Sequence, residues 1–304
     1  MEQIIPEDTR CCVCNNKDTD NFLLKYRKEG YIVVECKNCS FVFIPQYYSK
    51  KVSYEDFMDE KVLEQVKKGN NWLKIQRHLL RFKFIGKYQP NGSLFDLGTG
   101  WGHFLYTGKQ LGYEVHGIEV SKMPYKYAVS ELKLPVENID FFDMEIKNQE
   151  YDLITMWDVL EHIPDADDAV KRCNLLLKNG GYLVIQVPQI DSFIAKLLKD
   201  KWNMIGSVHA NYFSKKTIKK LFENYGFKLV RIKSSFEFKL FLMFVLGKKK
   251  KSRAAKQEYF NKTTERPKWM LKAMVVVHNI VYNFMSALGI GEEMMVVAQK
   301  IKPV

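Results

Sequence analysis

The chain has 304 residues, 46% of them hydrophobic and 27% charged, and a formal net charge of +12. This length and hydrophobic content are those of a soluble protein with one substantial core and one or two added modules. The basic excess lies in the C-terminal third, where residues 201–304 hold 21 Lys and Arg against 6 Asp and Glu. This confinement argues against a nucleic-acid-binding surface spread over the whole chain.

Residues 1–10 contain three acids and a proline, and so lack the basic and apolar pattern of a secretory signal. We therefore expect a cytoplasmic, reducing environment. In that environment the six cysteines are expected to be metal ligands or buried thiols rather than disulfides.

Two C-x2-C pairs, Cys11 with Cys14 and Cys36 with Cys39, are separated by 21 residues. Such pairs supply four thiolates for a closed, tetrahedral site, so residues 1–46 are predicted to form a zinc-ribbon-like module around a structural zinc. The alternative is a metal-free hairpin with buried cysteines. The next segment, residues 47–90, is polar and predicted to be a helical linker.

A glycine-rich loop, Asp96-Leu97-Gly98-Thr99-Gly100-Trp101-Gly102, follows the apolar run 93–95 and precedes a helical stretch. Glycines let the backbone turn sharply and touch a ligand, which a Cβ would prevent. His103 stands where a dinucleotide fingerprint has its third glycine, so the loop favours S-adenosylmethionine over NAD. Glu119 ends the next predicted strand, 113–119, at the distance expected for an acid that binds ribose hydroxyls.

The loop and the acid resemble those of class I S-adenosylmethionine-dependent methyltransferases, and the resemblance covers about residues 72–235 and 292–300. It implies an α/β fold with a Rossmann-like, seven-stranded sheet whose last strand is antiparallel. This domain would comprise residues 91–235 and 292–304, with residues 47–90 covering the pocket. The implied cofactor-binding residues are Asp96, Gly98, Thr99, Gly100, Trp101, Gly102, Glu119, Asp140 with Asp143 as the fallback near the adenine, Trp157 and Asp158.

The resemblance implies further strands at 133–140, 149–156 and 294–300. The residue pattern also predicts strands at 182–188 and 226–230 and helices at 165–178 and 215–224. Asp165 and Asp168 flank the start of the first of these helices, as an N-cap residue and an acid three residues later do. The run 179–181, Asn-Gly-Gly, is expected to end that helix in left-handed conformations.

Methyl transfer requires a positioned acceptor and a base that removes its proton. His162 follows the fourth strand, and His209 and Tyr212 lie where the family's chain folds over the acceptor. With Glu161, these are the candidate catalytic residues. Asp158, Glu161 and His162 also resemble the Glu-x-x-Glu-His run of ubiquinone-pathway O-methyltransferases, which can bind a divalent metal. Alternatively, Asp158 and Glu161 orient the loop while His162 faces the pocket.

Residues 236–291 are a basic, apolar insertion between the sixth and seventh strands, predicted to be helical. Its apolar runs fall short of the roughly 20 residues that cross a bilayer, so a spanning helix is not expected. One interpretation is peripheral contact with the inner face of the membrane. The other is a helix pair packed on the domain or forming a dimer.

The sequence therefore predicts a methyltransferase that acts by O- or C-methylation on a small-molecule or lipid-linked acceptor, such as a sugar, a glycan precursor or a quinone-like compound. A zinc ribbon before this domain resembles a subgroup that modifies sugars and other small acceptors. An RNA methyltransferase is the alternative enzyme, although the cysteine module lacks Arg-rich or aromatic repeats. The alternative from another class is a non-catalytic interaction protein that binds S-adenosylmethionine.

Overall fold

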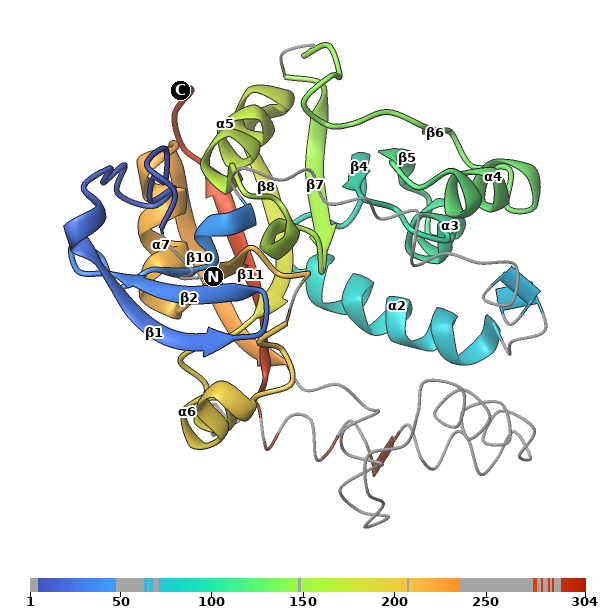
Figure 1. Ribbon diagram of the computed structural model, residues 1–304. Coiled ribbons are helices and arrows are strands. Elements are labelled where there is room, and N and C mark those ends of the chain that lie inside the picture. The colour runs from blue at the N-terminus through green and yellow to red at the C-terminus, as the bar shows by residue number, and fades with distance from the viewer. Residues whose placement is uncertain are drawn as a thin grey trace.

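A computed structural model describes residues 5–47, 63–64, 66–67, 71–146, 149–206, 208–235, 276–277, 280, 284, 286 and 291–304. The larger of its two sheets has the strand order β10-β11-β8-β7-β4-β5-β6 (Figure 1). Only β11 runs antiparallel to its neighbours, so the predicted Rossmann-like sheet with a reversed last strand is confirmed. The strands are β4 (Ser93–Leu97), β5 (Glu114–Ile118), β6 (Val136–Glu137), β7 (Tyr151–Trp157), β8 (Leu177–Pro188), β10 (Phe227–Ser235) and β11 (Glu293–Lys300).

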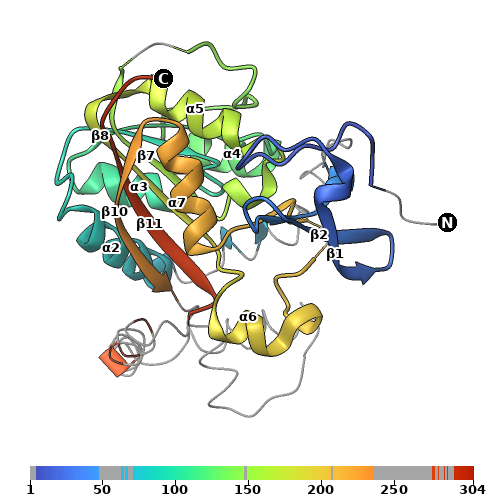
Figure 2. The same cartoon turned by 90° about the vertical axis from the view of Figure 1, so that its left-hand side faces the viewer.

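Helices cover both faces of this sheet. Successive residues of a strand point to opposite faces, so neighbouring residues contact different helices. Leu94 packs in the cluster that contains α2 and α3 side chains, whereas its neighbour Phe95 packs with α5 and α7. Figure 2 shows α7 lying across β10 and β11. The α-helices whose bounds lie in the described residues are α2 (Asn71–Ile85), α3 (His103–Gln110), α4 (Lys122–Ser130), α5 (Ala166–Leu176), α6 (Phe193–Leu198) and α7 (Lys215–Asn224).

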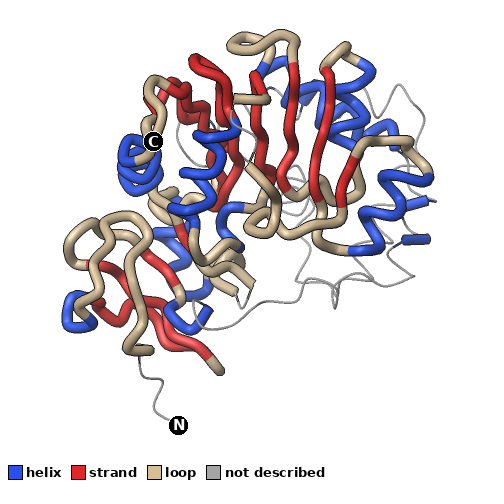
Figure 3. The backbone as a smooth tube through the Cα atoms, turned by 90° about the horizontal axis from the view of Figure 1, so that it is seen from above, coloured by secondary structure: helices blue, strands red, loops and turns tan. Residues whose placement is uncertain are grey.

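The second sheet belongs to the cysteine module, which forms a lobe beside the main sheet (Figure 3). A hairpin of β1 (Phe22–Lys28) and β2 (Tyr31–Cys36) is followed by the short β3 (Val42–Phe43). Its fourth strand, β9 (Asn211–Tyr212), comes from the connection between β8 and α7. The module predicted at residues 1–46 is therefore completed by a strand from the larger domain.

The chain also forms short 3-10 helices, one of which lies at the candidate site. That one is η4 (Leu160–His162), which follows β7. The described residues also form η1 (Thr19–Asn21), η2 (Pro45–Tyr47) and η5 (Lys199–Lys201).

Several predicted boundaries differ from those observed, including the start of β8 at Leu177 and the end of β10 at Ser235. Helix α5 ends at Leu176 and not at residue 178, because the carbonyls of Leu175 and Leu176 accept hydrogen bonds from the backbone of Gln149 and Glu150. The Asn-Gly-Gly run then enters β8 instead of capping the helix. The third strand is only two residues long and ends before Asp140.

The expected N-cap interaction of α5 is also absent. Asp165 occupies the N-cap position, but its carboxylate makes no capping hydrogen bond and binds Arg10 at 2.5 Å instead. Among the described residues, no helix has the length and apolar character needed to cross a membrane. Most of the predicted insertion, residues 236–291, lies outside the described residues.

Candidate functional site

The glycine loop, residues 98–102, joins the carboxyl end of β4 to the start of α3. Gly98, Gly100 and Gly102 have φ values of +73°, +54° and +75°, which glycine adopts without strain. A Cβ at Gly98 would lie 2.7 Å from Val159, whereas a Cβ at Gly100 would meet no described atom within 4 Å. The backbone at Gly100 therefore borders open space, as a loop that cradles a ligand must.

Glu119 follows β5 and lies against this loop. Its Oε2 accepts a hydrogen bond from the backbone nitrogen of Gly100 at 2.7 Å, and its Oε1 accepts one from Ser121 at 2.9 Å. The side-chain amide of Asn138 donates to the Glu119 carbonyl at 2.7 Å. The carboxylate is thus fixed between the glycine loop and the start of α4, beside the ligand cradle. Ribose binding by Glu119 stays a prediction that this position supports.

Asp96 lies at the carboxyl end of β4 and is buried. The hydroxyl of Thr155 donates to its Oδ1 at 2.5 Å. Burial raises the pKa of Asp96 to about 8, although the Thr155 hydrogen bond and the positive charge of Arg81 act in the opposite direction. Asp96 is therefore mainly protonated at neutral pH, and the sheet edge beneath the glycine loop carries less negative charge than its sequence suggests.

A buried polar network at the same edge was not predicted from the sequence. Arg81 of α2 donates to Gln186 at 3.2 Å, and its guanidinium lies 4.0 Å from the ring centroid of Trp157. Gln186 donates to Asp158 at 3.0 Å and to Glu293 at 2.8 Å. Burial lowers the pKa of Arg81 to about 10, so it remains charged at neutral pH. The sequence signal was Gln186 within the otherwise apolar run 182–188.

The remaining predicted cofactor residues lie on loops or at strand ends. Trp101 packs edge to face on Tyr127, with ring centroids 5.5 Å apart. Thr99 is buried. Asp140 is half-buried and accepts a hydrogen bond from the backbone of Phe142 at 2.9 Å, whereas Asp143 is exposed. Their contacts with a cofactor stay predictions.

The helical turn expected to gather Asp158, Glu161 and His162 does not form. Asp158 has a φ of +60°, and η4 begins only at Leu160. The Asp158 carboxylate turns to Gln186, as described above. The structure instead brings Glu161 and His162 together with His209, and one potential ligand atom from each lies within 4.8 Å of the others.

His162 and His209 form a pair whose ring centroids are 4.8 Å apart. The Nδ1 atom of His162 lies 2.7 Å from the carbonyl oxygen of Val208, and that of His209 lies 2.9 Å from the carbonyl oxygen of Met204. A carbonyl oxygen only accepts hydrogen bonds, so each Nδ1 carries the proton and each Nε2 keeps its lone pair. Burial lowers the pKa of both rings, that of His209 to about 4, with His162 contributing. Both histidines are therefore neutral at physiological pH.

Glu161 lies beside this pair and is 1% exposed. Its Oε1 is 3.9 Å from Nε2 of His162, and its Oε2 has no hydrogen-bond partner among the described residues. Burial, reinforced by the charge of Asp158, raises the pKa of Glu161 well above its usual value. Two imidazoles and a carboxyl group can hold a divalent cation, or a protonated Glu161 can donate a hydrogen bond to an acceptor oxygen.

Tyr212 was predicted to be catalytic, and the structure places it in the core instead. Its side chain is 0% exposed and packs with Val33 and Val42 of the cysteine module and with Trp202. Its hydroxyl donates to the carbonyl of Gly206 at 3.3 Å. The Tyr212 hydroxyl thus supports the loop that carries His209, and its catalytic role stays a prediction.

The predicted metal ligands come together in the cysteine module. Sulfur atoms of Cys11 and Cys39 are 3.5 Å apart, those of Cys14 and Cys36 are 3.6 Å apart, and all four lie within 4.8 Å of one another. Zn–S bonds of about 2.3 Å in a tetrahedron separate the sulfurs by about 3.8 Å, so these residues fit a structural zinc.

The two turns that carry the cysteines have the same geometry. Asn15 and Ser40 have φ values of +56° and +64°. Their backbone nitrogens donate to the carbonyls of Cys11 and Cys36, each at 2.7 Å. The serine thus adopts the left-handed conformation that asparagine tolerates better.

Comparisons with known proteins address the larger domain. A family model described as "Methyltransferase domain" matches residues 70–232. An uncharacterized protein of Methanocaldococcus jannaschii is 25% identical over 149 residues, covering 48% of this chain and 70% of that protein. A ubiquinone biosynthesis O-methyltransferase of Proteus mirabilis is 32% identical over 96 residues, covering 30% of this chain but only 39% of that enzyme.

A solved structure has the same fold. The crystal structure of a SAM dependent methyltransferase from Archaeoglobus fulgidus superposes with a TM-score of 0.52 at 21% identity, covering 80% of this chain and 100% of that chain.

Proposed function

This chain belongs to the methyltransferase-domain family, and from that premise we propose that it methylates an oxygen or carbon atom of a small organic acceptor. It is an S-adenosylmethionine-dependent methyltransferase. The proposed acceptors are a sugar, a glycan precursor or a quinone-like compound, free or linked to a lipid. The similarity to an O-methyltransferase of ubiquinone biosynthesis supports a small-molecule acceptor.

The observation that carries the proposal is the neutral histidine pair at the edge of the sheet where ligands of α/β folds bind. His162 follows β7, and His209 is held against it by β9. A hydroxyl or an activated C–H group must lose a proton when it accepts a methyl group, so an acceptor of this kind requires a base. The Nε2 lone pairs of the two histidines supply that base.

Each part of the site has a distinct proposed task. S-adenosylmethionine, when bound, supplies a methyl group activated by a sulfonium sulfur. The glycine loop and Glu119 bind and orient this donor. His209 removes the acceptor proton at Nε2, and His162 lies next to it as the second candidate base. Glu161 donates a hydrogen bond to the acceptor oxygen through its protonated carboxyl group.

We further propose that the four module cysteines hold a structural zinc. Four thiolates close a tetrahedral site and leave no position for a substrate. Zinc at this site therefore contributes to folding and takes no part in the transfer.

The insertion at residues 236–291 is proposed to contact the inner face of a membrane peripherally, which suits a lipid-linked acceptor. Its described side chains support this. Four apolar side chains are more than half exposed, namely Val276, Val277, Ile280 and Phe284. Val276, Ile280 and Phe284 are four residues apart, which places them on one face of a helix. Co-sedimentation with anionic liposomes, reversed by salt, tests this contact. Protein that stays in the supernatant at low salt would contradict it.

The acceptor class is tested by incubating the purified protein with methyl-labelled S-adenosylmethionine and separate pools of phenols, sugar nucleotides, lipid-linked sugars and RNA. We expect release of S-adenosylhomocysteine with one of the small-molecule or lipid-linked pools. Transfer to RNA would favour the RNA methyltransferase instead. Donor binding without turnover on any pool would favour a non-catalytic protein.

The matched variants are His209→Asn and His116→Asn. The asparagine amide can still donate to the Met204 carbonyl but provides no base, so turnover should fall by about 10²- to 10⁴-fold while donor affinity is kept. His116 bonds to Tyr151 and Glu137 on the opposite half of the sheet, and its substitution should leave turnover unchanged. Equal turnover of the two variants would exclude His209 as the base.

A further inference from the structure

The backbone of the cysteine module is continuous with the strand that carries His209. The knuckle Cys36–Cys39 leads directly into β3, which pairs with β9 in antiparallel register, Val42 opposite Tyr212. The backbone nitrogen of Ile44 donates to the carbonyl of Ala210 at 2.9 Å. His209 directly precedes Ala210 and is thus adjacent to the residue that accepts a hydrogen bond from the module.

Side-chain packing adds to this backbone pairing. Tyr212 and Phe213 are fully buried. The Phe213 ring lies 5.3 Å from that of Phe41, two residues after Cys39. Removing such large apolar side chains from water stabilises the contact between the module and β9. The position of β9 therefore depends on module side chains as well as on hydrogen bonds.

The opposite edge of β9 contacts the segment that carries His162. The backbone nitrogen of Ala210 donates to the carbonyl of Glu161 at 2.8 Å. The side-chain amide of Asn211 donates to the carbonyl of Ile163 at 2.6 Å. Strand β9 is therefore held between the module on one side and η4 on the other, and it sets the distance between the two histidines.

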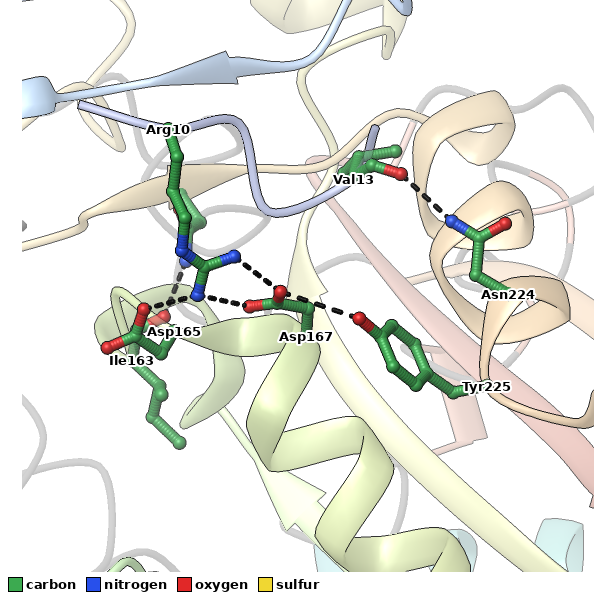
Figure 4. Close-up of polar contacts among 8 residues, drawn as sticks. Arg10, Val13, Ile163, Asp165, Asp167, Asn224 and Tyr225 are labelled. Atoms are coloured by element: carbon green, nitrogen blue, oxygen red, sulfur yellow. Dashed lines mark hydrogen bonds and ion pairs between the residues drawn. The ribbon is translucent and has the colours of Figure 1, made fainter. Parts of the chain in front are cut away.

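The first knuckle is attached to the same region (Figure 4). Arg10, next to Cys11, binds Asp165 at 2.5 Å and makes a bidentate pair with Asp167 at 2.5 and 2.9 Å. These two acids begin the helix that follows His162. The carbonyl of Val13 also accepts a hydrogen bond from Asn224 of α7 at 2.9 Å.

We infer that the cysteine module is a positioning element of the acceptor site. It holds β9 and the start of α5 so that His209 and His162 face one another. Loss of its metal then increases the motion of His162 and His209 relative to one another. The donor-binding loop at Gly100 and Glu119 stays ordered. This inference rests on the proposed function, because it takes the histidine pair as the acceptor side.

The size of the module explains why the metal matters. A segment of about 40 residues rarely buries enough surface to fold by itself and needs disulfides, a metal or a partner surface. None of the six cysteines, all of which lie in the described part of the chain, forms a disulfide, so no disulfide replaces the metal. The free energy of metal binding to the four thiolates therefore stabilises the folded form of β2 and β3. Through their pairing it also stabilises β9.

Hydrogen exchange of the full-length, zinc-loaded protein tests the inference without any acceptor. After removal of zinc with a chelator, amides of residues 208–213 should exchange at least tenfold faster. Amides of residues 96–102 should change less than twofold, and the Kd for S-adenosylmethionine less than threefold. Unchanged exchange at residues 208–213 would overturn the inference. Equal acceleration in both segments would also overturn it, because the module would then stabilise the fold as a whole.

Arg10→Ala provides a second test that leaves the cysteines intact. It should retain zinc and donor affinity but accelerate exchange at residues 161–168, and Arg10→Lys should restore part of the protection. Once an acceptor is known, Arg10→Ala should raise its KM more than that of the donor. The matched control is Lys25→Ala, which removes an ion pair with Glu35 on the same module. If both variants behave alike, Arg10 has no positioning role.

Because the exchange measurement needs no turnover, failure of the proposed acceptor chemistry and failure of this inference give different results.

Discussion

Substitution of Glu119 by glutamine tests how the donor is held. The Glu119 carboxylate accepts hydrogen bonds from Gly100 at 2.7 Å and from Ser121 at 2.9 Å, and it is predicted to accept ribose hydroxyls as well. Glutamine keeps one acceptor oxygen but turns an NH₂ group toward the other backbone donor. A hydrogen bond to a charged group contributes about 1.5–3 kcal/mol. The variant should therefore bind S-adenosylmethionine about 10- to 150-fold more weakly.

Titration calorimetry measures this affinity directly. The control is Glu137→Gln at the end of the neighbouring strand β6, where the carboxylate is exposed and pairs with His116 at 3.0 Å. We expect its Kd to stay within threefold of the wild-type value. Circular dichroism of both variants checks that the sheet is intact. If Glu119→Gln also binds within threefold of wild type, the carboxylate does not contact the donor and its assignment is wrong.

The pKa of Asp96 is raised to about 8, so in the folded protein Asp96 keeps a proton that the unfolded chain loses near pH 4. Its contribution to the free energy of unfolding therefore falls as pH rises from about 4 to 8. Urea unfolding should show a flatter decline of this free energy for Asp96→Asn than for wild type over that range, and parallel curves would contradict the pKa shift. With its pKa of about 4, His209 should support turnover that is flat from pH 8 to about 6, and a rate that halves near pH 6.5 would indicate an unperturbed base. Elemental analysis should find one zinc per chain in wild type and in Cys173→Ser, but little in Cys39→Ser, and equal zinc in both variants would exclude the four-cysteine site.

Local sequence was sufficient for the features that depend on neighbouring residues. Gly98, Gly100 and Gly102 predicted a loop that turns sharply, and all three have the positive φ values that glycine adopts without strain. The amphipathic pattern of residues 215–224 predicted α7 with its observed bounds. The two C-x2-C pairs predicted a cluster of four sulfurs, since each knuckle closes within a few residues.

Features that depend on distant residues were missed. The sequence grouped Asp158 with Glu161 and His162 by helical spacing, but a φ of +60° at Asp158 turns its carboxylate toward Gln186, 28 residues later. Tyr212 was placed where the chain folds over the acceptor, and its burial against Val33 and Val42 of the module was not foreseen. Arg81 gave no signal, because its partners lie on strands that are far away in sequence.

The sequence by itself determined the fold class, the glycine loop and the cluster of four cysteines, because each depends on residue types at short, regular spacing. Only the tertiary structure brought together the residues that we propose for the acceptor side. His162 and His209 are 47 positions apart, and their rings meet because β9 leaves its own domain to pair with β3 of the module. A hydrogen bond between two short strands so far apart in the chain leaves no periodic pattern in either of them.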